Sequence, residues 1–305
     1  MRYLFSDLIL SSDEPLPELR DAGDATPEVE VSWRPAGLGE EHPAFAAWTT
    51  PSGGEWLTFA ETTDGYELTF AEHTQFHVSR DAARVIVRPA HGTPPATTRH
   101  LLLNQVLPLV LSRRGRLVLH ASAISWNGHV TAFIGRSGAG KSTMAAACAA
   151  AGALVVTDDC LVLRRDGADA STRWVAVPCD SGVRLWPQTL DLLGWPRGSG
   201  SGMAHFTDKR RVGALHPSLQ FETRLLPLTR VVSLTRPDEP VRSGALRGRD
   251  AVMALASELF RLDVRDPRES RWQFDAISAL AADVPMVAGA RQHPSAAAAA
   301  VLCRM

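Results

Sequence analysis

The sequence predicts a mixed α/β protein of two domains, with a β-rich N-terminal domain ahead of an α/β core. Three observations indicate this class: short β-like runs before residue 95, a helical pattern over 97–112, and a strand, a glycine-rich loop and a helix in succession over 129–151. We expect the first domain to span residues 1–95 and the second to span residues 96–305. A chain of 305 residues is long enough for two ordinary domains.

The first domain is expected to be a small, mainly antiparallel β structure. Its clearest strands are short apolar runs at 56–59, 66–70 and 83–87. The polar, proline-bearing stretch 11–29 interrupts the pattern, and residues 89–95 have the proline and glycine content of a linker.

The second domain is expected to begin with a helix. Residues 97–112 carry apolar side chains at helical spacing, and the basic and glycine residues at 113–115 are typical of a helix end. We expect this helix to pack against the core that follows. Residues 116–125 then predict a strand, the Asn-Gly pair at 127–128 predicts a tight hairpin, and residues 130–134 predict the strand that leads into the glycine-rich loop.

Charge and cysteine content exclude several classes of protein. Lys and Arg number 32 against 33 Asp and Glu, a net charge of −1, so no overall basic field favours a nucleic-acid or membrane partner. The four cysteines show no C-x-x-C spacing, and we interpret them as free thiols rather than as a disulfide framework or a zinc site. No apolar run is long enough for a signal sequence or a membrane helix, so we expect a cytoplasmic protein.

The glycine-rich loop matches the phosphate-loop pattern G-x-x-x-x-G-K-[ST]. Glycines let consecutive backbone N–H groups turn inward and surround phosphate oxygens. We expect Lys141 to reach the β- and γ-phosphates of a nucleotide and the Ser142 hydroxyl to bind Mg²⁺. The predicted nucleotide-binding residues of this segment are Gly135, Arg136, Ser137, Gly138, Ala139, Gly140, Lys141, Ser142 and Thr143. The alternative interpretation is a glycine-rich turn that happens to hold a lysine.

An acidic pair, Asp158 and Asp159, follows the next predicted strand at 154–157. Side chains alternate along a strand, so adjacent aspartates do not point the same way, and one can serve a metal while the other serves a nucleophile. Phosphoryl transfer needs one carboxylate to orient or deprotonate the attacking hydroxyl. The alternative interpretation is a solvated turn after a strand.

A histidine completes the pattern. His120, in the Leu-His-Ala-Ser segment 119–122, precedes the loop, and the acidic pair follows the loop. This order resembles that of the HPr kinase/phosphorylase family and of its relative, ATP-dependent phosphoenolpyruvate carboxykinase. The resemblance covers about residues 100–235 and is greatest to HPr-kinase-related proteins found near peptide-modification genes. It implies a phosphate-loop kinase core of this type behind the β-rich N-terminal domain.

The resemblance also implies roles for individual residues. Asp158 would hold Mg²⁺ or a metal-bound water, Asp159 would face the acceptor as the base, and His120 would line the acceptor side of the transferring phosphoryl group. From the residues alone, His120 is as consistent with a satisfied core histidine as with a functional one. The chain lacks the carboxy-terminal signature with which HPr kinases dock HPr, so HPr is not the expected acceptor.

A basic segment at 203–212 follows the Gly/Ser-rich stretch 198–202. We expect Lys209 and Arg210 to contact nucleotide phosphates from a lid that closes over the site. A solvated basic face is the alternative interpretation. Arg184 is a second candidate for steering phosphate or an acidic acceptor.

Together these features predict a kinase that uses ATP and Mg²⁺ to phosphorylate a hydroxyl, in the first place a serine of a peptide or small protein. Asp159, His120 and Lys141 are the expected catalytic residues, and Ser142 and Asp158 are the expected metal ligands. Two alternatives stay open: a small-molecule alcohol kinase on the same core, and a nucleotide-binding regulatory module without transfer. The sequence does not decide between a monomer and a homo-oligomer.

Overall fold

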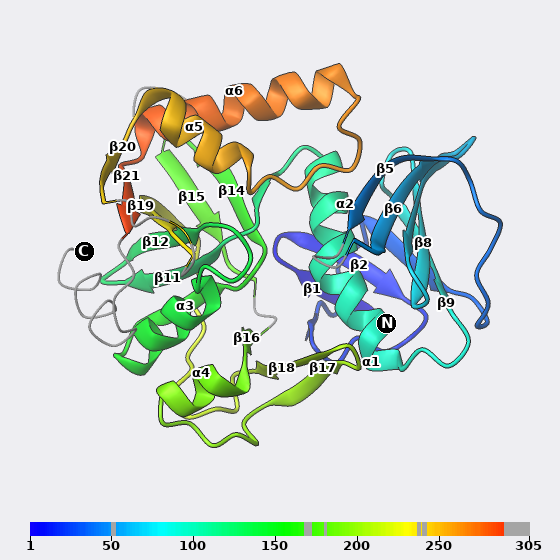
Figure 1. Ribbon diagram of the computed structural model, residues 1–305, viewed down its shortest axis with the longest axis horizontal. Helices are drawn as coiled ribbons and strands as arrows, with labels where there is room; N and C mark the ends of the chain where they lie inside the picture. The colour runs from blue at the N-terminus through cyan, green and yellow to red at the C-terminus, as the bar shows by residue number, and fades with distance from the viewer. Residues whose placement is uncertain (50–52, 168–172, 180–181, 237–238, 240–242, 290–305) are drawn as a thin grey trace. The chain divides into compact units, whose positions relative to one another are not determined.

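The computed structural model describes residues 1–305 except 50–52, 168–172, 180–181, 237–238, 240–242 and 290–305. The chain is a mixed α/β protein with several sheets, as predicted, and it divides into two compact units (Figure 1). The first unit comprises Met1–Gly115 and Met203–Thr207, and the second comprises Arg116–Gly202 and Asp208–Met305. The division therefore falls at Gly115 instead of at residue 95.

A nine-stranded sheet forms most of the first unit, in the order β3-β1-β2-β4-β9-β8-β7-β6-β5. Its neighbours are antiparallel except at β2–β4 and β4–β9, which are parallel. The strands are β1 (Arg2–Phe5), β2 (Leu8–Ser12), β3 (Arg20–Asp21), β4 (Val29–Trp33), β5 (Ala44–Thr49), β6 (Glu55–Glu61), β7 (Gly65–Phe70), β8 (Thr74–Ser79) and β9 (Arg84–Pro89). The three strands predicted from the sequence lie in β6, β7 and β9, while β3 lies within the stretch that showed no strand pattern.

Three consecutive helical segments follow: α1 (Pro95–Leu101), the π-helical turn η1 (Leu102–Val106) and α2 (Leu107–Arg113). The helical prediction for 97–112 is thus confirmed. The π-helical turn has a cause in the sequence, because Pro108 has no N–H to donate to the carbonyl of Asn104 and the regular α pattern is interrupted there. The segment is part of the first unit, and not of the second as predicted.

A second nine-stranded sheet is the centre of the second unit. Its order is β10-β14-β15-β19-β12-β11-β13, with β21 also paired to β19 and β20 paired to β21. β12 and β21 are parallel to β19, and the other pairs are antiparallel. The strands are β10 (Leu117–Leu119), β11 (Ser122–Trp126), β12 (His129–Ile134), β13 (Leu154–Thr157), β14 (Leu161–Asp166), β15 (Arg173–Val177), β19 (Leu226–Leu234), β20 (Gly244–Leu246) and β21 (Met286–Gly289).

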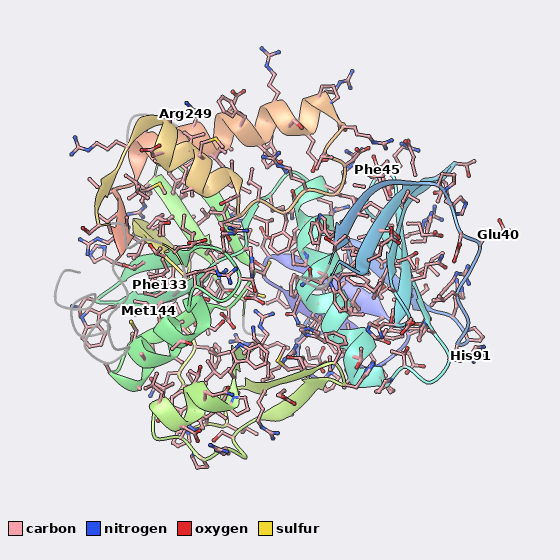
Figure 2. All side chains as sticks on the ribbon, in the orientation of Figure 1. Glu40, Phe45, His91, Phe133, Met144 and Arg249 are labelled. Carbon is pink, nitrogen blue, oxygen red and sulfur yellow. The ribbon has the colours of Figure 1, made fainter. Side chains whose placement is uncertain are left out.

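Helices cover both faces of this sheet (Figure 1). On one face, α5 (Gly248–Ala256) and α6 (Pro267–Asp283) bury an apolar layer that includes Ala132 and Ile134 of β12. On the other face, α3 (Lys141–Ala150) packs on Phe133, and Met144 of α3 joins it there (Figure 2). The alternation along β12 therefore places its side chains in both layers, which explains why this strand is apolar without a period of two.

A small three-stranded sheet, in the order β16-β18-β17, lies beside α3 and the helix α4 (Pro187–Leu192). Its strands are β16 (Val183–Leu185), β17 (Ser201–Ala204) and β18 (Thr207–Val212). Val183, Leu185 and Val212 from these strands share a buried cluster with Ala146 of α3 and Leu190 of α4. The basic segment predicted as a lid is thus mostly regular strand, and its first part, 203–207, belongs to the first unit.

The predicted strand at 116–125 is two strands in the structure. β10 and β11 lie in different parts of the sheet, and His120 with Ala121 separates them. The backbone N–H of His120 donates to the carbonyl of Glu258 at 2.7 Å, so a contact distant in the sequence replaces strand pairing at this point. The predicted hairpin of β11 and β12 is confirmed, with Asn127 and Gly128 both at positive φ.

A buried carboxylate, Glu222, holds its segment against β13. Its backbone N–H donates to the carbonyl of Val155 at 2.8 Å, and its side chain accepts hydrogen bonds from Ser125 and Arg224, each at 3.0 Å. The bond from the Arg224 side chain, with backbone N–H groups and Ser125 assisting, lowers the pKa of Glu222 from 4.5 to about 2 against the opposing effect of burial.

This carboxylate leads to a prediction on acid stability. Because the folded-state pKa lies below the unfolded one, Glu222 stabilises the fold above pH 4.5, and its contribution is lost as the pH falls toward about 2. We expect Glu222→Gln to lower the midpoint of urea unfolding at neutral pH and to approach the wild type as the pH falls through this window. Circular dichroism checks the midpoint, with Asp275→Asn as an exposed control. A deficit that is the same at every pH would contradict the charge-based explanation.

Three of the four cysteines lie within the described residues. Cys148, Cys160 and Cys179 are buried and form no disulfide, and Cys303 lies outside the described residues. Among the described helices, none is both long and apolar enough to cross a membrane.

Candidate functional site

The glycine-rich loop connects β12 to α3, as the sequence predicted. Gly135 has a φ of 136°, and a Cβ at this position would lie 2.5 Å from the carbonyl oxygen of Leu234, so only glycine fits. Gly140, at a φ of 97°, is the N-cap of α3 and supplies no side-chain cap, which leaves the first N–H groups of the helix directed toward the loop. The start of this helix is therefore suited to an anion.

Lys141 is almost completely buried, and its Nζ donates to the carbonyl of Gly135 within its own loop. The same Nζ lies 3.9 Å from Oε2 of Glu258. Burial lowers the pKa of Lys141, and the nearby carboxylates of Glu258 and Asp159 partly oppose that change. A phosphate group at the loop would give this buried ammonium a stronger partner than the carbonyl it contacts here.

Asp158 follows β13 and is enclosed by protein. One carboxylate oxygen accepts from Ser122 Oγ at 2.6 Å, and the other accepts from the Arg184 backbone N–H at 2.9 Å and from its Nε at 3.3 Å. The Arg184 guanidinium also donates to the backbone carbonyl of Asp158. Both side chains are buried, so Asp158 and Arg184 form a buried ion pair whose hydrogen bonds are supplied by β11 and β16.

Asp159 has a positive φ of 68° and a partly exposed side chain, unlike its neighbour. Its Oδ2 lies 2.9 Å from Nη1 of Arg184, and its Oδ1 lies 3.4 Å from Nε2 of His120. Burial acts to raise the pKa of Asp159, but Arg184 and His120 together hold that pKa well below its ordinary range. Asp159 is therefore an ionised hydrogen-bond acceptor at neutral pH, and one guanidinium contacts both members of the acidic pair.

His120 lies between two carboxylates. Its Nε2 faces Asp159, and its Nδ1 lies 3.7 Å from Oε2 of Glu258. Glu258 is buried, and it faces both His120 and Lys141. Sequence reasoning missed Glu258 because this residue lies in no motif. A signal was present, since Glu258 is an acidic residue between an apolar run that ends before Ser257 and another that begins at Leu259.

The predicted phosphate-binding pair at 209–210 separates in the structure. Lys209 Nζ lies 5.3 Å from the centre of the Trp186 ring, and its charge contributes to the lowered pKa values of Asp159 and Lys141, which places it near the site. Arg210 instead donates to the backbone carbonyls of the stretch 198–200. Its guanidinium thus binds the Gly/Ser-rich segment, so we no longer expect Arg210 to contact a nucleotide.

The residues of the site fit a nucleotide-bound Mg²⁺ better than a protein-held ion. Mg²⁺ at such sites takes most of its ligands from phosphates and water, with only one or two protein oxygens. The Ser142 hydroxyl, in the first turn of α3, suits this role. Asp158 does not, because both of its oxygens accept protein hydrogen bonds. The described part of the chain has no group of three or more His, Cys, Asp or Glu side chains that could hold a metal ion.

The chain has matches among solved structures. No protein-family model and no curated protein matches the chain. Among solved structures, the Hpr(Ser) kinase/phosphatase from Coxiella burnetii aligns over 61% of this chain and 93% of its own length, at 12% sequence identity and a TM-score of 0.35. A match at this sequence identity and TM-score assigns no activity to this chain.

Proposed function

We propose that the protein is a phosphotransferase that binds Mg·ATP at the loop 135–140 and transfers the γ-phosphoryl group to a hydroxyl, in the first place a serine of a peptide or small protein. Lys141 and Ser142 would hold the phosphates and the metal, and Asp159 would receive the hydroxyl proton. Mg²⁺ would neutralise charge on the phosphates when bound.

One observation carries the proposal. Glu258 lies 3.9 Å from Lys141 and 3.7 Å from His120, and His120 lies 3.4 Å from Asp159. The lysine that would bind the phosphates and the carboxylate that would face the acceptor therefore belong to one connected cluster. A glycine-rich turn holding a lysine by chance has no reason to adjoin such a cluster.

The proposed chemistry needs few covalent changes. The oxygen of the acceptor hydroxyl forms a bond to the γ-phosphorus, the bond from that phosphorus to the ADP oxygen breaks, and the hydroxyl proton passes to Asp159. Phosphoryl transfer proceeds largely through a loose transition state, so the proton leaves late and a base of low pKa suffices. His120 and Arg184 hold Asp159 in place, and Lys209 adds positive charge close to it.

The test is phosphorylation of a serine-containing peptide library by the full-length protein with labelled ATP and Mg²⁺, alongside a panel of small polyols. Labelled peptide supports the proposal, label in the polyols alone supports the small-molecule alternative, and no labelled product with a broad panel supports a regulatory module without transfer.

Lys141→Ala is the variant that links this activity to the loop. Its ammonium should contact the transferring phosphoryl group most strongly in the transition state, so we expect the rate to fall about 10²–10³-fold while nucleotide affinity changes much less. Steady-state kinetics and calorimetric titration of Mg·ATP measure the two effects. Arg271→Ala, an exposed cation on α6, is the control and should match the wild type. Full activity in Lys141→Ala would place the reaction elsewhere.

A further inference from the structure

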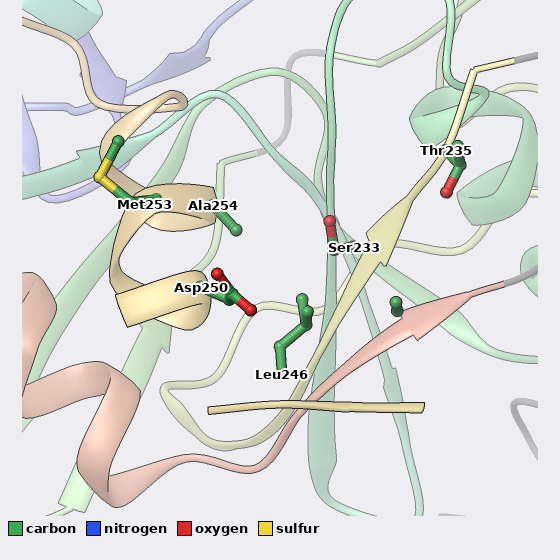
Figure 3. A pocket seen from close by; sticks show the side chains of 7 residues that line it. Ser233, Thr235, Leu246, Asp250, Met253 and Ala254 are labelled. Atoms are coloured by element: carbon green, nitrogen blue, oxygen red, sulfur yellow. The ribbon is translucent and has the colours of Figure 1, made fainter. Parts of the chain in front are cut away.

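The second unit contains a cavity of about 250 Å³ between α5 and the strands β19, β20 and β21, open to solvent where the exposed Asp250 and Met253 line it. Figure 3 shows the side chains that line it, with those of α5 on one side and those of β19 on the other. They are Ser233, Thr235, Leu246, Asp250, Met253, Ala254 and Ala288. No residue of this set is among those assigned to the loop or to the acidic cluster.

The cavity adjoins the glycine-rich loop on the β19 side. Ser233 is the register partner of Ile134, the last residue of β12 before the loop begins. The carbonyl of the next residue, Leu234, is the atom that leaves no room for a Cβ on Gly135. Arg136 of the loop also lies 3.4 Å from Glu239, which follows β19 in the chain, in an ion pair. The strand that forms one wall of the cavity is therefore the strand against which the loop is built.

The cavity also adjoins the loop on the α5 side. Asp250 and Ala254 are four residues apart and so share one face of the helix. Glu258, which faces Lys141, follows four residues after Ala254, in a turn closed by its N–H bond to the carbonyl of Leu255 at 3.0 Å. One helix and the turn that follows it thus connect the wall of the cavity with the carboxylate that faces Lys141.

The chemistry of the lining suits a nucleobase and not a phosphate. Four of the seven lining residues are apolar, and the polar groups are two hydroxyls and one carboxylate. The Asp250 side chain is exposed, and no hydrogen bond or ion pair among the described residues includes its carboxylate. A free carboxylate repels phosphate but accepts hydrogen bonds from an amine. The volume is below the roughly 300–1,000 Å³ of sites for drug-sized ligands, which fits a single flat ring system rather than a whole nucleotide.

We propose that this cavity receives the base of the nucleotide whose phosphates bind the loop, and that Asp250 selects a base carrying an exocyclic amine. The inference rests on the proposed nucleotide binding, and it adds the specificity for the base. Leu246 and Met253 would cover the faces of the ring, and the Ser233 and Thr235 hydroxyls would bond its edge. Asp250 lies in the first turn of α5, where its charge also favours the helix, so the test includes thermal unfolding of the variants.

The experiment compares three ligands on the full-length protein with Mg²⁺: ATP, purine riboside triphosphate, which lacks the amine, and inorganic tripolyphosphate, which lacks the nucleoside. For the wild type we expect calorimetric titration to show ATP binding about tenfold more tightly than purine riboside triphosphate. Asp250→Ala should remove most of that difference and leave the affinity for tripolyphosphate unchanged. Ala254→Phe, which fills the cavity, should weaken both nucleosides and spare tripolyphosphate.

Asp275→Ala, an exposed carboxylate on α6, is the matched control and should behave as the wild type. If both cavity variants are folded and bind ATP as the wild type does, while the wild type transfers phosphate to peptide and Lys141→Ala does not, the cavity is not the base site and the proposed function stands. If neither ATP nor tripolyphosphate binds the wild type, the proposed function fails and the base site fails with it.

Discussion

Replacing Asp159 by asparagine is expected to stop phosphoryl transfer while leaving Mg·ATP bound. An amide is nearly isosteric with a carboxylate but cannot accept the hydroxyl proton, and loss of a general base costs about 10²–10⁴-fold in rate. Arg184 keeps its contacts with Asp158 in this variant, so the surroundings should remain folded. Rapid-quench measurement of peptide phosphorylation and calorimetric titration of Mg·ATP check the two halves of the expectation.

The control for this variant is Asp275→Asn, which removes an exposed carboxylate on α6 and should change neither quantity. Transfer at the wild-type rate in Asp159→Asn would show that Asp159 is not the base. If Asp159→Asn binds nucleotide poorly but the nucleotide-bound protein transfers phosphate at the wild-type rate, Asp159 holds the metal together with Ser142.

Removing the neighbouring carboxylate should act on stability instead. Breaking a buried ion pair on one side leaves the other charge uncompensated and costs about 3–5 kcal/mol in the free energy of unfolding. In Asp158→Ala, the buried guanidinium of Arg184 keeps Asp159 as a partner, so we expect the lower end of this range. Urea unfolding followed by circular dichroism measures the change.

Asp191→Ala is the matched control, because it breaks an exposed pair with Arg197 and should leave the urea midpoint almost unchanged. An Asp158→Ala protein of wild-type stability that has lost Mg²⁺-dependent ATP binding would restore the metal role implied by the family resemblance. The two aspartates, adjacent in the chain, are thus expected to give separable phenotypes, one in turnover and one in folding.

The elements that were predicted well are those whose signal is local. The glycine-rich segment 135–140 lies between β12 and α3 as predicted, because glycine conformations, apolar strands and alanine-rich helices depend on neighbours in the chain. The hairpin at 127–128 follows for the same reason. The helix prediction for 97–112 also held, although the π-helical turn before Pro108 was not predicted.

The errors concern which elements meet. The pattern at 116–125 is apolar throughout, and nothing local shows that His120 leaves the strand to bond with Glu258. The helix at 97–112 has an apolar face that either neighbouring core could bury, so its place in the first unit could not be determined from periodicity. The basic run at 203–212 resembled a mobile lid because charged residues predominate, yet Val212 is in a buried cluster and Arg210 binds backbone carbonyls.

The sequence by itself determined the composition of the site: a loop able to surround phosphate, a lysine and a serine behind it, two aspartates after the next strand and a histidine before the loop. Only the tertiary structure decided which of these groups are buried and which of them contact one another. It buries Asp158 against Arg184, leaves Asp159 facing His120, and brings Glu258 from the end of α5 to Lys141. The physical reason is that motifs report backbone conformation over a few residues, whereas burial and charge pairing depend on residues that are distant in the chain and meet only when the sheet and its covering helices assemble.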